Sequence, residues 1–202
     1  MIRNKVYWSG PILLVLILII VLWFAPLERT LGSTIKYVYL HVALTWCGMV
    51  GIALMAAMGV GTLFRRSDIL DFYRKIIGWV TIFAWGISIL ISAFAAKIAW
   101  GSISWSEPLM SVALMILISL LIVQIYEHII RSHVVRGLLS IAPSGFLIVL
   151  AGKVTRVLHP LDPIHTSNSM SIKLTFNIVF IICLLLAAWV VWMAEQRRKS
   201  ND

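Results

Sequence analysis

The chain has 202 residues, of which 61% are hydrophobic and 12% charged, and its formal net charge is +9 at pH 7. A soluble globular domain of this size cannot accommodate so apolar a composition, which therefore predicts an integral membrane protein. The positive charge is typical of membrane proteins that retain Lys and Arg on the cytoplasmic side, and we expect no nucleic-acid binding.

Long apolar runs divide the chain into six segments, each with roughly the 20 residues that a helix needs to cross a bilayer. We expect an all-α integral membrane bundle of six transmembrane helices forming one domain, 1–202, because lipid admits only helices or closed barrels and these runs do not alternate as barrel strands do. The first run contains Pro11 and lacks a small-residue cleavage site after it, so we expect a retained span and no signal peptide. The expected spans are 8–26, 37–64, 76–98, 108–127, 137–154 and 172–194.

The Lys and Arg residues predict the orientation of these spans. Of the 17 such residues, 11 lie in the two termini and in the second and fourth loops, so we expect both termini to be cytoplasmic and the first, third and fifth loops to face outward. The charges of the inner loops are expected to be solvated. Lys97 and Glu127 lie near span ends, where we expect them to reach water.

The residues with the most distinctive chemistry fall in or beside the expected outer loops. His41 shares a helix face with Tyr37 and Thr45 at the start of the second run, and an ionisable side chain at that place is a functional candidate. An imidazole at the headgroup level that bonds to a neighbour or to water is an equally simple interpretation. Cys47 and Cys183 have no partner at a short metal-type spacing and predict neither a zinc site nor a redox motif.

His159 and His165 bracket the sequence HPLDPIH in the fifth loop. The two prolines restrict the backbone and hold His159 and Asp162 in a stiff non-helical turn, as a metal ligand requires. Asp162 could orient a histidine through its second ring nitrogen. The alternative is an ordinary short loop that uses Pro and Asp for turn formation.

Two histidines on separate helix ends suit haem, whose iron takes axial ligands on both faces and whose apolar disc favours aromatic neighbours. Trp100 and Trp105, between the two histidine segments, could cover such a disc, although tryptophan also anchors helices at membrane interfaces. Candidate partners for the haem propionates are Arg29, Lys36 and Arg156, which could equally be solvated loop charges.

The order of these motifs resembles the CcmC-type haem-handling proteins of cytochrome c maturation. The matching stretches are YLHV at the start of the second span, WGSISWSEP between the third and fourth, and LHP between the fifth and sixth. The resemblance assigns the axial ligands to His41 and His159, with His165 as a weaker alternative. It assigns the tryptophan-rich segment to Trp100, Gly101, Trp105, Glu107 and Pro108. That segment departs from the pattern W-G-x-x-W-x-W-D by a shifted tryptophan, a serine and a glutamate.

The resemblance implies a protein of the bacterial inner membrane that binds haem b at the outer leaflet and delivers it to a haem chaperone. It also implies an ABC-transporter pair and a small single-span subunit as partners. Two other functions remain open from the residues: an electron-transferring cytochrome b-type subunit, and a small transporter or structural subunit without haem. No nucleophile and base arrangement predicts an enzyme.

Overall fold

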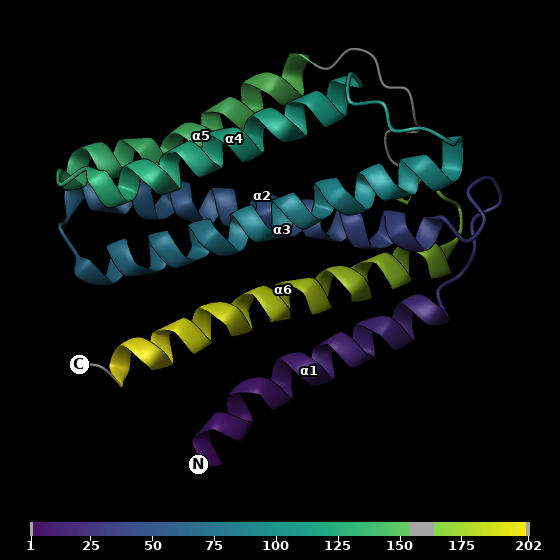
Figure 1. The fold of residues 1–202 in the computed structure, drawn as a ribbon, viewed down its shortest axis with the longest axis horizontal. Coiled ribbons are helices and arrows are strands. Elements are labelled where there is room, and N and C mark those ends of the chain that lie inside the picture. Colours follow the sequence, from purple (N-terminus) through teal and green to yellow (C-terminus); the bar gives the residue numbers. More distant parts are fainter. Residues whose placement is uncertain (1, 154–163, 201–202) are drawn as a thin grey trace.

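The structure of the protein is a computed structural model that describes residues 2–153 and 164–200. The described residues form six α-helices and no β-strand, so the all-helical prediction is confirmed (Figure 1). The helices are α1 (Ile2–Trp23), α2 (Ile35–Phe64), α3 (Asp68–Trp100), α4 (Pro108–Ile129), α5 (His133–Lys153) and α6 (Met170–Lys199).

Five of these helices, α2 to α6, are long and apolar enough to cross a membrane. Within α1 the apolar stretch is the shorter Tyr7–Trp23. The described helices are therefore those of a multi-pass membrane protein.

The helix α3 begins earlier than the hydrophobic pattern indicates. We expected a polar break over 65–75, but only a short connection separates α2 from α3. Ser67 caps the new helix, with its hydroxyl oxygen accepting a hydrogen bond from the Leu70 backbone N–H at 3.4 Å. Asp68 and Asp71 place negative charge in the first turn, where the helix dipole favours it. The extension adds two polar turns to the bundle.

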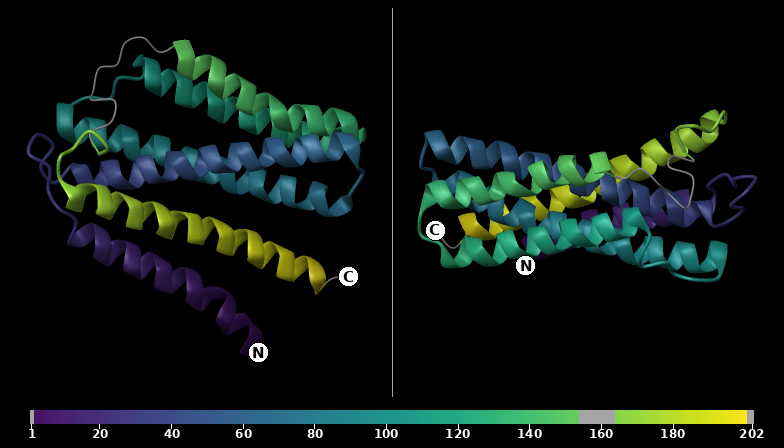
Figure 2. Two further views of the ribbon diagram at one scale, coloured as in Figure 1. Left: turned by 180° about the vertical axis from the view of Figure 1, so that it is seen from behind. Right: turned by 90° about the horizontal axis from the view of Figure 1, so that it is seen from above.

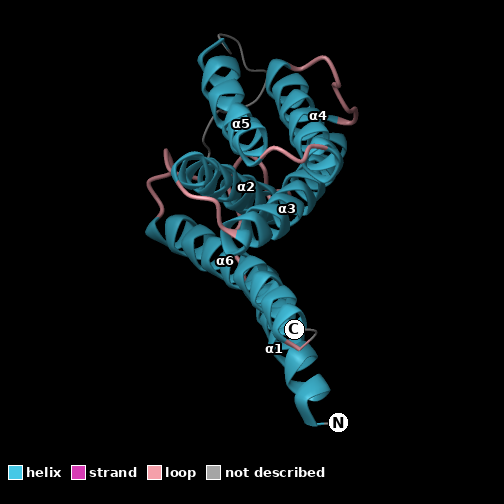
Figure 3. Cartoon of the chain, turned by 90° about the vertical axis from the view of Figure 1, so that its left-hand side faces the viewer, coloured by secondary structure: helices cyan, strands magenta, loops and turns pink. Residues whose placement is uncertain are grey.

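The helices α2 and α3 form the centre of the bundle, with α4 and α5 on one side and α6 on the other (Figures 1 and 3). The helix α1 lies outermost and packs mainly against α6. The loops 24–34 and 101–107 and the start of α6 gather at one end, which we call the cavity end. Both termini and the loops 65–67 and 130–132 lie at the opposite end, the termini end (Figure 2).

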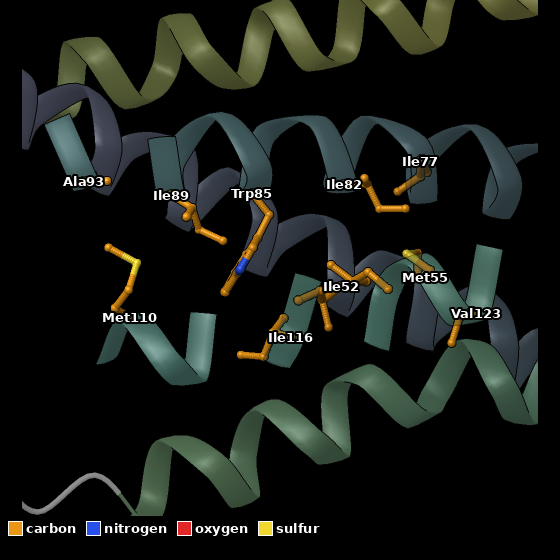
Figure 4. Close-up of a cluster of buried hydrophobic side chains, with 11 residues drawn as sticks. Ile52, Met55, Ile77, Ile82, Trp85, Ile89, Ala93, Met110, Ile116 and Val123 are labelled. Carbon is orange, nitrogen blue, oxygen red and sulfur yellow. The ribbon is translucent and has the colours of Figure 1, made fainter. Parts of the chain in front are cut away.

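The main hydrophobic core lies between α2, α3 and α4. Ile52, Trp85 and Ile116 are buried at its centre and point toward one another in Figure 4. The Trp85 indole N–H donates a hydrogen bond to the Ala113 carbonyl oxygen at 2.9 Å. On the α2 side, a Cβ atom at Gly48 would lie 2.5 Å from ring carbon Cε3 of Trp85. The indole therefore fills the space between three helices.

We expect Gly48→Ala to lower the free energy of unfolding by about 1–3 kcal/mol, because the rigid ring of Trp85 cannot yield to the added methyl without shifting a helix. Gly86→Ala is the matched control, since its Cβ would meet no atom nearer than Leu117 Cδ1 at 4.0 Å. Alanine favours a helix interior by up to about 1 kcal/mol, so the control is expected to be neutral or stabilising. Thermal unfolding in detergent measures both, and equal melting temperatures would contradict the expectation.

Candidate functional site

A cavity of about 400 Å³ opens at the cavity end, between the first turns of α2, the last turns of α3 and the start of α4. Its volume is within the range of small-molecule and cofactor sites. The wall residues come from the loop 24–34, from α2, from α3 and from the segment that leads into α4. They are Leu31, Thr34, Val38, His41, Val42, Thr45, Trp46, Ser92, Ala95, Ala96, Ala99, Trp100, Ser102, Ser104, Glu107, Leu109 and Met110.

Three of the binding-site residues predicted from the sequence line this cavity: His41, Trp100 and Glu107. They come from α2, from the end of α3 and from the residue before α4. Trp105 and Arg29 are exposed and are not among the wall residues. Of the two tryptophans expected to form one surface, only Trp100 contributes to it.

The second predicted axial ligand, His159, lies outside the described residues, as do Arg156 and Asp162. The described part of the fifth connection resumes at Ile164, which is buried against α2 and α6. From Ile164 onward the chain therefore packs beside α2, the helix that carries His41.

His165, the alternative ligand, lies behind one wall of the cavity. Its ring stacks on Trp46 with the ring centres 5.2 Å apart and the planes at 16°, and Trp46 itself lines the cavity. Phe176 and Phe180 of α6 meet the Trp46 ring edge-on. Trp46 was not predicted as a site residue, although it lies five residues after His41 in the same helix.

Two hydroxyl groups contact the backbone of His41, that of Thr45 from the same helix and that of Ser88 from α3. Thr45 Oγ1 lies 2.9 Å and Ser88 Oγ 2.8 Å from the His41 carbonyl oxygen, and the two hydroxyl oxygens are 2.6 Å apart. Two hydroxyl hydrogens can serve only two of these three contacts at once. The position of His41 is thus coupled to α3 at the base of the cavity.

The loop 24–34 places Leu31 in the cavity wall through a turn held by Glu28. The Glu28 carboxylate accepts hydrogen bonds from the backbone N–H groups of Leu31 and Thr30, both at 2.7 Å, and Gly32 has a left-handed φ of 55°. These hydrogen bonds lower the pKa of Glu28 below its ordinary value, and the bond from Leu31 has the largest effect. The ionised carboxylate therefore stabilises the turn at pH values above the ordinary carboxyl pKa. This stabilisation is lost as the pH falls through the lowered pKa of Glu28.

A second polar group, not predicted from the sequence, lies at the termini end. The side chain of Arg74 is fully buried, with Nε 2.8 Å from Glu127 Oε1 and Nη2 3.0 Å from Asp71 Oδ1. Glu127 is only 1% exposed. The expectation that Glu127 reaches water, and that the inner-loop charges are solvated, is therefore wrong for these residues.

Two residues of α5 extend this group. Arg136 Nη2 lies 2.8 Å and His133 Nδ1 3.0 Å from the second oxygen of Asp71. We call Asp71, Arg74, Glu127, His133 and Arg136 the ionic cluster. Its two arginines balance its two carboxylates, and it joins α3, α4 and α5.

The signal for this cluster is a spacing along α3. Polar or small side chains and one tryptophan recur at alternating intervals of three and four residues, which places them on one helix face. Six of them are buried, and the last lines the cavity. They are Asp71, Arg74, Gly78, Thr81, Trp85, Ser88 and Ser92.

The described cavity residues fit part of a haem group. One imidazole, two indole rings and aliphatic walls suit a porphyrin ring with a histidine ligand on one side. The described wall contains Glu107 but no Lys or Arg, so haem propionates would have to point out of this part of the cavity. Lys36, near its opening loop, donates instead to the Trp23 carbonyl oxygen at 2.7 Å. Among the described residues, no three His, Cys, Asp or Glu side chains gather as a metal site.

The chain matches neither a protein-family model nor a curated protein sequence.

Proposed function

We propose that this chain is a membrane protein that binds haem b in the cavity beside His41 and delivers it to a haem chaperone during c-type cytochrome maturation. The observation that carries the proposal is the shared position of His41, Trp100 and Glu107. These residues belong to two of the three motifs that resemble CcmC-type proteins, and they line one cavity. By the same resemblance, we propose an ABC-transporter pair and a small single-span subunit as partners.

In this proposal His41 supplies one axial nitrogen to the haem iron and His159 the other, with His165 as the alternative. Trp46 and Trp100 cover the ring, and the Thr45 and Ser88 hydroxyls hold the backbone of His41 in position. Bound haem supplies the iron and the visible absorbance. A site at the end of the bundle, in contrast to one at its centre, favours release to an acceptor as well as capture.

The experiment is purification in detergent after expression with ample haem. We expect a low-spin haem Soret band and transfer of that haem to an acceptor apoprotein, which an electron-transferring cytochrome b would not perform. Wild-type protein without haem under these conditions would refute the proposal. Retained haem that no acceptor removes would favour the cytochrome b-type alternative.

We further propose that the termini end is cytoplasmic and the cavity end faces outward across a bacterial inner membrane. The 11 Lys and Arg residues of the cytoplasmic set support this orientation, since they lie at or near the termini end.

This orientation predicts which single cysteines react with a membrane-impermeant thiol reagent in intact spheroplasts. In a variant lacking Cys47 and Cys183, Ser106→Cys at the cavity end is expected to be labelled. Ser132→Cys at the termini end is the matched control, because both serines are exposed and lie in loops. It is expected to react only after the membrane is permeabilised, and the reverse pattern would show the opposite orientation.

A further inference from the structure

Gln124 is a buried amide in the membrane-spanning part of α4. Its side chain is fully buried, and neither Oε1 nor Nε2 has a hydrogen-bond partner among the described residues. The amide presses against Gly78 of α3, where any Cβ atom would collide with it. The side chain is therefore held in the interface between α3 and α4. Buried polar groups in proteins are nearly always hydrogen-bonded, either to protein or to ordered water.

Glu127 brings a second such atom to the same place. Its Oε1 forms an ion pair with Arg74 Nε and accepts a hydrogen bond from Ser140 Oγ, both at 2.8 Å, whereas its Oε2 is buried without a described hydrogen-bond partner. Gln124 and Glu127 are three residues apart on α4 and share a face of it. Their contacts on α3, Gly78 and Arg74, are four residues apart in the opposite direction, as expected for antiparallel neighbours.

Because Gln124 and Glu127 are three residues apart, their Cα atoms are separated by about 4.5 Å along the helix axis. Two hydrogen bonds of ordinary length through one small molecule span that separation. The ligand must accept from the amide N–H and donate to a carboxylate oxygen. An anion is excluded by Glu127, and a cation by Arg74, whose charge already faces the same carboxylate.

We propose that a water molecule binds between the Gln124 amide and Glu127 Oε2 as an internal ligand of the ionic cluster. It accepts a hydrogen bond from Gln124 Nε2 and donates one to Glu127 Oε2, and its second hydrogen is available to Gln124 Oε1. Leu120 and Val123, which precede Gln124 in the same helix, are also buried, and a closely packed interior favours water over a larger polar molecule.

The water extends the ionic cluster by one turn toward the middle of the membrane. It also completes the hydrogen bonding of Glu127, whose first oxygen holds Arg74 and Ser140. Gln124 is therefore a binding residue for the water and not an isolated polar side chain that the bundle tolerates.

Gln124→Met tests this proposal, because the substitution keeps the length of the side chain and removes both amide atoms. If water is bound, the variant leaves Glu127 Oε2 and the water with fewer partners, and the melting temperature falls by several degrees. If the amide is dry and unbonded, the same substitution removes two unsatisfied atoms and the melting temperature rises. A rise would overturn the proposal.

The matched control is Leu120→Met, one turn away on the same helix and equally buried, where a volume-conserving substitution has a small effect. A crystal structure of the wild-type chain in a lipidic phase gives the direct readout. We expect a density peak within hydrogen-bond distance of the Gln124 amide and Glu127 Oε2, and its loss in Gln124→Met. An ordered wild-type site without that peak would overturn the proposal.

Discussion

His41→Ala is expected to abolish the low-spin Soret band of the purified protein. The substitution removes the only imidazole among the described residues that line the cavity, and leaves the aliphatic and indole walls in place. Haem held by those walls alone would lack an axial nitrogen from this chain on that face, so its spectrum should be lost or become high-spin. Absorbance spectra of variants expressed to equal levels provide the measurement.

His128→Ala is the matched control for this prediction. His128 is near the termini end, where its Nδ1 lies 2.8 Å from the Gln124 carbonyl oxygen, and it is not a wall residue. Its variant should keep the wild-type band. His159→Ala is expected to behave like His41→Ala. If His165→Ala removes the band and His159→Ala leaves it intact, the second ligand is His165 and the proposed function survives. Retention of the band in His41→Ala would refute the proposed site.

Arg74→Met should destabilise the bundle by about 3–5 kcal/mol, the usual effect of removing one partner from a buried ion pair. The arginine is fully buried and pairs with both Asp71 and Glu127, so the variant leaves the cluster with two carboxylates and a single arginine, Arg136, which pairs with Asp71. Thermal unfolding in detergent measures the change.

Lys75→Met removes the same charge from the next residue, which is only partly buried, and its effect should stay within about 0.5 kcal/mol. The double variant Arg74→Met, Glu127→Met restores the balance of one carboxylate and one arginine. It is expected to recover part of the lost stability, because replacing a buried pair with apolar side chains is often nearly neutral. Equal melting temperatures for Arg74→Met and Lys75→Met would contradict a role for the cluster.

The helical architecture could be predicted because it depends on one-dimensional properties: the length and hydrophobicity of each run. The same is true of the grouping of His41, Trp100 and Glu107, since alternate loops of a membrane bundle return to the same end. The location of Trp105 could not be predicted in this way. It follows Trp100 by five residues, but the intervening turn leaves it exposed outside the cavity.

The ionic cluster could not be predicted because it depends on which helices are neighbours. Arg74 and Glu127 are far apart in the sequence, and each on its own resembles a charge near the end of a span. Their burial follows from the early start of α3, which carries Asp71 and Arg74 inside the bundle beside α4 and α5. The regular spacing of polar residues along α3 indicates that they share one face of the helix. The sequence does not indicate that this face points toward α4 and α5.

The Trp85 ring lies between the two polar regions, seven residues along α3 from Ser92 at the cavity and eleven from Arg74 in the ionic cluster. Its contact with Gly48 and its bond to Ala113 close the three-helix seam at that level. Because this packed seam separates the cavity from the ionic cluster, we expect a ligand bound in the cavity to leave by the end at which it entered.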